Sequence, residues 1–262
     1  MKAVIFDISG RMAHFRRFYS SVTALSYYFP PRNTVTGLIA AILGYDRDSY
    51  YAMFSRKNLG VAVSINNKNG LRRLMLNTNY LDTDSVTLSK LRGKGKVPTA
   101  VEYVLPMPPE TDVSYRIYII SLNHELDNIV DELAARMERR EYAYPPSLGP
   151  ANCLAYIELI SPSIDAEILR VYGEEKISLP ISTVIPYSII PEDGLKFDAG
   201  KKIVLEERLP PDFADGRSIE GASMSYIFEY GGNAINITLD SRASEKIFKV
   251  GIEDRTVYGA LM

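Results

Sequence analysis

Two stretches with helical periodicity constrain the fold of the first 160 residues most strongly. Strand-like stretches lie before, between and after them. The first stretch has an apolar stripe at helical spacing, formed by Val35, Leu38, Ile39 and Ile42. Asn33 or Thr34 is expected to cap its start, and Gly44 follows where a helix-terminating glycine belongs. The sequence therefore predicts an amphipathic helix between a proline pair and this glycine.

A second helix is predicted after Asn123, which provides an N-cap. Its apolar stripe comprises Leu126, Ile129, Val130, Leu133 and Met137. The first turn is acidic and the last turn is basic, as the helix dipole favours. A shorter helix is expected over residues 47–54.

Strand patterns flank both helices. They cover residues 2–8, 59–65, 113–120 and 154–160, and residues 71–76, after a turn, are expected to return along the strand before them. The resulting order of strand, helix, strand, strand, helix, strand is the ferredoxin-like βαββαβ plan, which RNA-recognition motifs share. The predicted class is α+β, with a ferredoxin-like domain over residues 1–160.

Two further regions complete the predicted organisation. Residues 78–99 are polar and basic, contain Gly93 and Gly95, and predict a loop or hairpin, called the thumb, that projects from the body. The last hundred residues show only strand-like pieces, at residues 184–190, 202–207, 223–230, 234–239 and 256–262. A β-rich C-terminal region over residues 161–262 is expected to pack on the first domain.

The charge distribution is uneven, although the net charge is only −2. Two windows, residues 8–45 and 85–101, contain no carboxylate. Their cations are Arg11, Arg16, Arg17, Arg32, Lys90, Arg92, Lys94 and Lys96. The rest of the chain is correspondingly acidic, so a polyanion would be drawn to these windows. Charge alone supports a polyanion-binding surface and two solvated basic loops equally well.

Several function classes receive no support. A single cysteine, Cys153, excludes an internal disulfide and suits a reducing cytosol, and two histidines make a Cys/His zinc site improbable. No apolar run is long enough to span a membrane, and Asp7 interrupts the start too early for a signal peptide. The Gly-Lys-Gly-Lys string lacks phosphate-loop spacing, and Asp82 with Asp84 is better explained as a polar turn. A cytoplasmic protein without cofactor or metal is expected.

Three segments carry a family resemblance. Residues 6–18 contain a strand followed by a glycine turn and three arginines; residues 28–39 contain a Pro-x-Arg helix start followed by Gly-Leu; residues 97–104 contain Pro-Thr-x-x-Glu-Tyr. In this order they resemble the fifth family of CRISPR-associated (Cas) proteins, within the RAMP superfamily of ferredoxin-like RNA binders. The resemblance covers the first 105 residues well and the remainder only through its strand order.

The resemblance implies a subunit of a type I interference complex, Cascade, that takes part in antiviral defence. Such subunits hold the 5′ handle of the CRISPR RNA (crRNA), contact the neighbouring backbone subunit through the thumb, and meet the large subunit. Target DNA would be reached only through the complex. The match favours the non-cutting branch, similar to types I-A and I-B.

The candidate RNA-binding residues combine cations with flat rings and with the first helix start. They are Arg11, His14, Arg16, Arg17, Tyr19, Tyr27, Tyr28, Arg32, Asn33, Gly37, Lys90, Arg92, Lys94 and Lys96. Cations neutralise phosphates, rings stack on bases, and a helix N-terminus attracts anions. The structural alternatives are a solvated Arg32, a packing role for Gly37, and core positions for Phe15 and Phe18.

Catalysis is not expected. The cutting branch of the family uses a tyrosine with an adjacent lysine–histidine pair, whereas here His14 follows Ala13 and His124 follows Asn123. A metal-independent endoribonuclease that uses Lys94 or Lys96 with Tyr27 is the alternative. A ferredoxin-like regulator or metabolic enzyme is the third class, and it would need a polar pocket that the sequence does not indicate.

Overall fold

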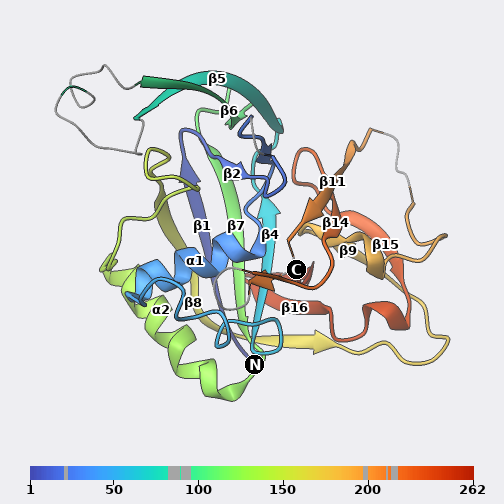
Figure 1. The fold of residues 1–262 in the computed structure, drawn as a ribbon. Helices are drawn as coiled ribbons and strands as arrows, with labels where there is room; N and C mark the ends of the chain where they lie inside the picture. The colour runs from blue at the N-terminus through green and yellow to red at the C-terminus, as the bar shows by residue number, and fades with distance from the viewer. Residues whose placement is uncertain (21–22, 82–88, 90–95, 197–199, 211, 214–217) are drawn as a thin grey trace.

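The computed structural model describes residues 1–20, 23–81, 89, 96–196, 200–210, 212–213 and 218–262 (Figure 1). These residues form a mixed α/β protein in which strands predominate and only two α-helices occur. The predicted mixture of helices and strands is therefore confirmed. No helix in the described ranges is both long and apolar enough to cross a membrane.

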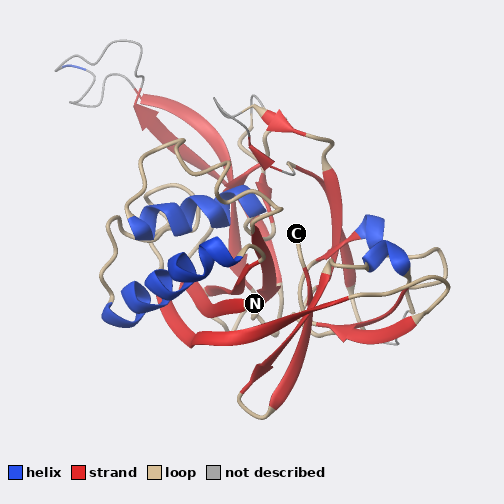
Figure 2. Ribbon diagram, turned by 90° about the horizontal axis from the view of Figure 1, so that it is seen from below, coloured by secondary structure: helices blue, strands red, loops and turns tan. Residues whose placement is uncertain are grey.

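The first half of the chain places two helices on one face of a sheet (Figure 2). Its elements are β1 (Lys2–Gly10), α1 (Arg32–Leu43), β4 (Leu59–Ile65), β7 (Val113–Ser121), α2 (Asp127–Arg139) and β8 (Tyr156–Leu169). The strands lie in the order β8-β1-β7-β4, and each neighbouring pair is antiparallel. Consecutive strands joined by a helix are thus separated in the sheet by another strand.

The helix ends follow local chemistry. Gly44 ends α1 in the left-handed conformation, with φ 79°, as predicted. Asn123 caps the turn before α2, because its side chain accepts a hydrogen bond from the Glu125 N–H at 3.1 Å. Two predictions are wrong: α1 begins at Arg32 after Pro31, ahead of the proposed caps, and residues 47–54 form turns. The left-handed Asp48, with φ 67°, prevents a helix there.

A long hairpin, formed by β5 (Leu71–Leu81) and β6 (Lys96–Pro106), projects from the body (Figure 1). Contrary to the prediction of a returning strand, β5 pairs with β6 and forms a separate sheet. Isolated bridges join β6 to Ala13 and Ala24. They hold the short pair β2 (Phe15–Arg16) and β3 (Ser26–Tyr27) against the hairpin base. Of the predicted thumb, residues 82–88 and 90–95 lie outside the described residues.

The C-terminal part continues the main sheet. Beyond β8 the order runs through β16 (Ile247–Ile252), β17 (Arg255–Ala260), β9 (Ile177–Ile181) and β15 (Ile235–Leu239). A smaller sheet contains β10 (Ile185–Pro186), β14 (Met224–Glu229) and β11 (Ile203–Leu209), and β12 (Asp212–Phe213) pairs with β13 (Ile219–Glu220). Strands β9 and β16 were not predicted, and residues 184–190 form only β10 and a 3₁₀ turn, η3 (Tyr187–Ile189). The proposed division at residue 160 falls inside β8 and remains a prediction.

The core explains why β1 is buried on both faces. Val4 and Phe6 pack with the helices, as the predicted alternation requires. Ala3 and Ile5 pack on the opposite face against Phe248, which the C-terminal strand β16 contributes. The two halves of the chain therefore share the central sheet between two apolar layers.

Candidate nucleic-acid interface

Cations and exposed rings gather at the base of the hairpin. Tyr19 lies close to two arginines: the guanidinium carbon of Arg17 is 6.0 Å from its ring centroid, and that of Arg208 is 5.5 Å away. Phe18 packs edge-on against Tyr19, with their ring centroids 5.4 Å apart. With Arg16, these residues form what we call the arginine–aromatic cluster: Arg16, Arg17, Phe18, Tyr19 and Arg208. Phe18 and Tyr19 are 46% and 37% exposed, so their rings are available for stacking.

A buried ion pair and neighbouring hydrogen bonds connect this cluster to β11 and to the hairpin. Arg17 pairs with the buried Glu206 of β11, and its Nη1 donates to the Tyr19 hydroxyl at 2.9 Å. Burial raises the pKa of Glu206, whereas Arg17 opposes that rise. On the other side, Arg73 donates to the Ser26 carbonyl at 3.1 Å, which also accepts from Arg17 Nε at 3.1 Å. Arg17 therefore positions Tyr19 and is itself largely committed to Glu206.

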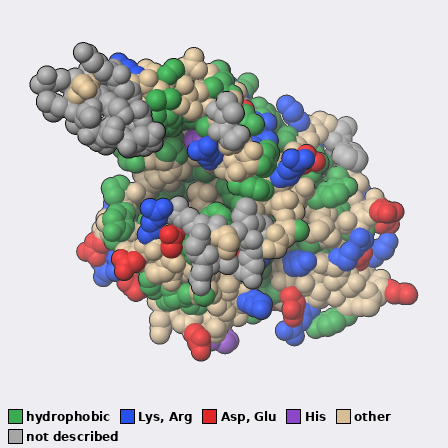
Figure 3. Space-filling view, viewed as in Figure 1, with side chains coloured by type: hydrophobic (Ala, Val, Ile, Leu, Met, Phe, Trp, Pro, Cys, Tyr) green, Lys and Arg blue, Asp and Glu red, His purple; other side chains and the backbone are tan. Residues whose placement is uncertain are grey.

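Arg16 ends β2, donates to the Ser20 carbonyl at 3.4 Å, and has different neighbours from Arg17, which lies outside that strand. It is exposed and lies close to Tyr80 of β5 and to His14. Burial and Tyr103 raise the pKa of Tyr80, whereas Arg16 lowers it. The space-filling view shows Lys and Arg side chains near a hollow between the hairpin and the body (Figure 3).

The outer strand of the hairpin exposes apolar side chains. These are Leu74, Met75, Leu76 and Tyr80 of β5, with Val97 of β6, each 42–46% exposed. Residues 74–81 carry no charge, and the outer edge of β5 has no strand partner among the described residues. Exposed apolar strands of this kind are typical of surfaces that other chains cover.

Arg32 lies in the interior, which corrects the prediction that it contacts phosphate from the surface. Its side chain is 2% exposed and pairs with Asp212 of β12. Nη2 also donates to the carbonyls of Phe54 and Leu59, at 2.7 and 2.8 Å. Burial lowers the pKa of Arg32, and Asp212 opposes that effect. The guanidinium thus ties the start of α1 to β4 and β12.

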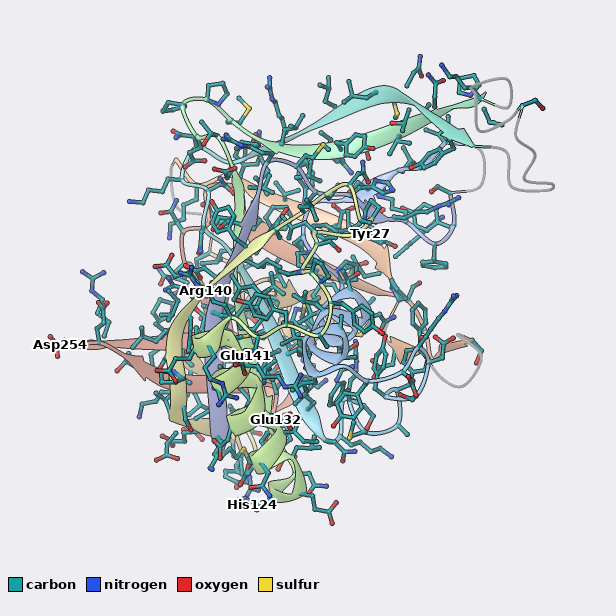
Figure 4. All side chains as sticks on the ribbon, turned by 90° about the vertical axis from the view of Figure 1, so that its left-hand side faces the viewer. Tyr27, His124, Glu132, Arg140, Glu141 and Asp254 are labelled. Atoms are coloured by element: carbon teal, nitrogen blue, oxygen red, sulfur yellow. The ribbon has the colours of Figure 1, made fainter. Side chains whose placement is uncertain are left out.

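Three other predicted contacts are also internal. Tyr27 is fully buried, and its hydroxyl donates to the Arg208 carbonyl at 2.6 Å (Figure 4), so the ring cannot stack on a base. His14 is 6% exposed, with Nδ1 2.8 Å from the Glu102 carbonyl oxygen, and burial lowers its pKa. A side chain at Gly37 would meet the Tyr50 hydroxyl at 3.2 Å, so this glycine accommodates protein packing.

The remaining predicted residues are dispersed. Tyr28 is half-buried beneath Arg73, whose guanidinium carbon is 4.3 Å from the ring centroid, and Asn33 is half-buried in α1. Arg11 is exposed and pairs with Asp112 at 3.5 Å. Lys96 is exposed at the start of β6, roughly 17 Å along the strand from the Ala24 bridge at the rise of an extended chain. Lys90, Arg92 and Lys94 lie outside the described residues.

Comparison with known proteins identifies the family. The family model described as CRISPR-associated protein (Cas_Cas5) matches residues 3–178, about two thirds of the chain. The chain belongs to this family. The resemblance inferred from the three sequence segments is thereby confirmed. No curated protein matches the chain.

A solved structure supports the fold of this Cas_Cas5 protein. A crystal structure of a CRISPR protein from Archaeoglobus fulgidus is 13% identical and has a TM-score of 0.57, with 99% of this chain and 100% of that chain covered. A chain of a CRISPR RNA-guided surveillance complex is 16% identical, with a TM-score of 0.47 and coverage of 89% and 91%. At these identities the first match shows a shared fold.

The family resemblance did not identify every residue that the Cas_Cas5 fold brings near Arg16, Arg17 and Tyr19. Arg208 follows two glutamates in the sequence, which hides it from a search for basic windows. Tyr80 and Arg73 lie between the two carboxylate-free windows. The one signal for them in the sequence is a pair of adjacent arginines at positions 72–73, at the start of a predicted strand. Only the fold places Arg208 beside Tyr19, Tyr80 near Arg16, and Arg73 beside Arg17 at the Ser26 carbonyl.

Proposed function

We propose that this Cas_Cas5 protein binds the 5′ handle of crRNA within a type I interference complex, and that it does not cut RNA. The observation that carries the proposal is the arginine–aromatic cluster, in which Tyr19 lies close to Arg17 and Arg208 and beside the exposed Phe18. Single-stranded RNA is recognised by this combination, since cations track the phosphates and rings stack on unpaired bases.

We further propose that the first 160 residues are a ferredoxin-like module. Support comes from the antiparallel order β8-β1-β7-β4 and from two helices on one face of that sheet. In this arrangement the hairpin and the arginine–aromatic cluster lie together at one end of the module (Figure 1). RNA held there would contact the protein mainly through shape and backbone, with sequence matching left to the guide's own base pairing.

The hairpin is proposed to contact the neighbouring backbone subunit. Leu74 and Leu76 are exposed on its outer strand, and a protein partner would bury them. The large subunit is the other expected neighbour, and target DNA would be met only through the assembled complex.

Binding without cleavage is supported by the state of the titratable groups. Metal-free cleavage needs a base near the 2′-hydroxyl and an acid for the leaving oxygen. His14 is buried with a lowered pKa, and burial raises the pKa of Tyr27, whose hydroxyl is already bonded to a carbonyl. Burial likewise raises the pKa of Cys153 to about 11, so a thiolate is disfavoured at neutral pH.

The test is to measure binding of labelled handle RNA by fluorescence anisotropy at several salt concentrations. Arg16→Ala with Arg208→Ala should weaken binding and lower the salt slope by roughly 0.7 for each phosphate that the variant no longer neutralises. Tyr19→Ala should weaken binding about tenfold, whereas Tyr19→Phe should retain most stacking. Lys57→Ala with Arg255→Ala, which removes two exposed cations elsewhere, is the matched control.

Two outcomes would contradict the proposal. Equal losses of RNA affinity in the cluster variant and the control would mean that RNA binding depends only on the overall charge of the protein. Release of product from precursor crRNA in EDTA would favour the endoribonuclease alternative.

A further inference from the structure

The first half of strand β8 has an open edge. On one side, β1 pairs with β8 from Tyr156 to Asp165. On the other side, β16 pairs only with residues 166–169. Just before β8, Ser147 bridges to Leu154, and the Ala155 N–H donates to the Pro146 carbonyl at 3.0 Å. Between these two pairings, no described residue occupies the backbone edge of β8.

A groove of about 780 Å³ runs beside this open edge. One wall comes from the end of α2 and the segment after it, with Met137, Arg140 and Tyr142. The other wall is β8 itself, with the half-buried Ile157 and Leu159. Figure 4 shows Arg140 and Glu141 at the end of α2, beside this part of the sheet. A groove bordered by unpaired backbone and apolar side chains fits an extended chain.

The regular part of the edge is short. Pro162 has no N–H, and the pairing of β8 with β1 shifts register on either side of Ser161. Residues 156–159 therefore offer the uninterrupted stretch, which spans roughly 13 Å at the rise of a strand. This length matches about four residues of an added strand.

The charges in the groove select among occupants. Glu138 and Glu158 both line it, are exposed, and have no ion partner among the described residues, whereas Arg140 is its single cation. Two free carboxylates disfavour a nucleic-acid phosphate. A second copy of this chain is disfavoured too, because pairing two β8 edges would double the carboxylates in the joint. A peptide with basic side chains complements both the charge and the open backbone.

We propose that the open edge of β8 binds an extended segment of a protein partner, which adds as a strand and places basic side chains opposite Glu138 and Glu158. Main-chain hydrogen bonds to residues 156–159 provide affinity, and the apolar floor with the two carboxylates provides selectivity. This interaction goes beyond the proposed RNA function and does not depend on it.

The test uses the labelled hexapeptide acetyl-(Lys-Val)₃-amide as a probe with the full-length protein. Binding is measured by fluorescence anisotropy. Methylation of alternate backbone nitrogens, in either of the two registers, should weaken binding at least tenfold in one register, because an added strand needs those N–H donors. The acidic counterpart acetyl-(Glu-Val)₃-amide should bind about fivefold more weakly.

Protein variants give the matching arm. Glu138→Lys with Glu158→Lys should reverse the preference to the acidic peptide, while Glu174→Lys with Glu175→Lys, exposed carboxylates before β9, should leave it unchanged. A reversed preference also shows that the variant is folded.

Four results would overturn the proposal. They are binding unaffected by methylation in both registers, an unreversed preference, displacement of the peptide by handle RNA, and self-association of the protein through this edge. Retention of handle RNA by the Glu138/Glu158 variant keeps the outcome separate from that of the proposed RNA function.

Discussion

Arg32 and Asp212, 180 residues apart in the chain, form an ion pair in which the arginine side chain is only 2% exposed. The pair joins the first helix to the C-terminal strands, and two backbone carbonyls accept the remaining hydrogen bonds of Nη2. Removal of one partner of such a pair leaves a desolvated charge without compensation.

Arg32→Ala should therefore lower the free energy of unfolding by about 3–5 kcal/mol, measured by urea denaturation. Arg11→Ala, at an arginine that is 78% exposed, should change it by less than about 0.5 kcal/mol. If Arg32→Ala kept full stability and lost only RNA affinity, the interior role assigned to Arg32 would be wrong.

The apolar edge of the hairpin leads to a prediction about assembly. Leu74→Lys with Leu76→Lys should abolish association with the neighbouring backbone subunit, because two cations would enter an apolar contact. The variant should remain folded, since both side chains are more than 40% exposed. Leu205→Lys, at an equally exposed leucine of β11, is the control. Co-purification at matched expression checks the result, and normal assembly of the double variant would exclude the hairpin as the contact.

The buried His14 should make stability depend on pH. Burial lowers its pKa below the ordinary value of 6.5, so the folded protein binds this proton more weakly than the unfolded chain does. The stability that the buried, neutral His14 contributes is fully present above pH 6.5. It is lost as the pH falls toward the pKa of His14 in the folded protein. Between pH of about 7.5 and about 5, wild type should lose more stability than His14→Gln, by at most about 1.4 kcal/mol per pH unit.

Identical curves for wild type and His14→Gln would mean that His14 accepts a proton without cost in the folded protein.

Gly149 should tolerate substitution poorly. Its φ is 107°, and an added Cβ would lie 2.0 Å from the His14 carbonyl oxygen, which is a backbone atom. Gly173 also has positive φ, 57°, but nothing lies within 4 Å of its added Cβ. Gly173→Ala should cost about 1–2 kcal/mol and Gly149→Ala at least about 3 kcal/mol by urea denaturation. Equal costs would show that the backbone at His14 moves freely.

Local patterns in the sequence predicted much of the first half of the fold. Leu59–Ile65 is β4 with the predicted bounds, and Gly44 and Asn123 mark helix ends because each acts through its own conformation or side chain. Strand β9 was missed because Pro180 interrupts its pattern, although an isolated proline can occupy a sheet position without a required donor.

Contacts between distant segments limited the prediction of the interface. The basic windows correctly drew attention to Arg16 and Arg17, but nothing near Arg32 in the sequence indicates that Asp212 neutralises it. Tyr27 and Tyr28 are adjacent, yet only the fold decides that one is buried and the other lies beneath Arg73. Charge patterns indicate that a polyanion could bind, whereas burial decides which cations can meet it.

Strand β8 is continuous from Tyr156 to Leu169, with its first part bonded to β1 and its last part to β16. A strand shared in this way makes one continuous backbone segment part of both ladders, so the two halves of the chain meet within a single strand. Exchange of C-terminal halves between relatives would have to preserve the register within this one strand.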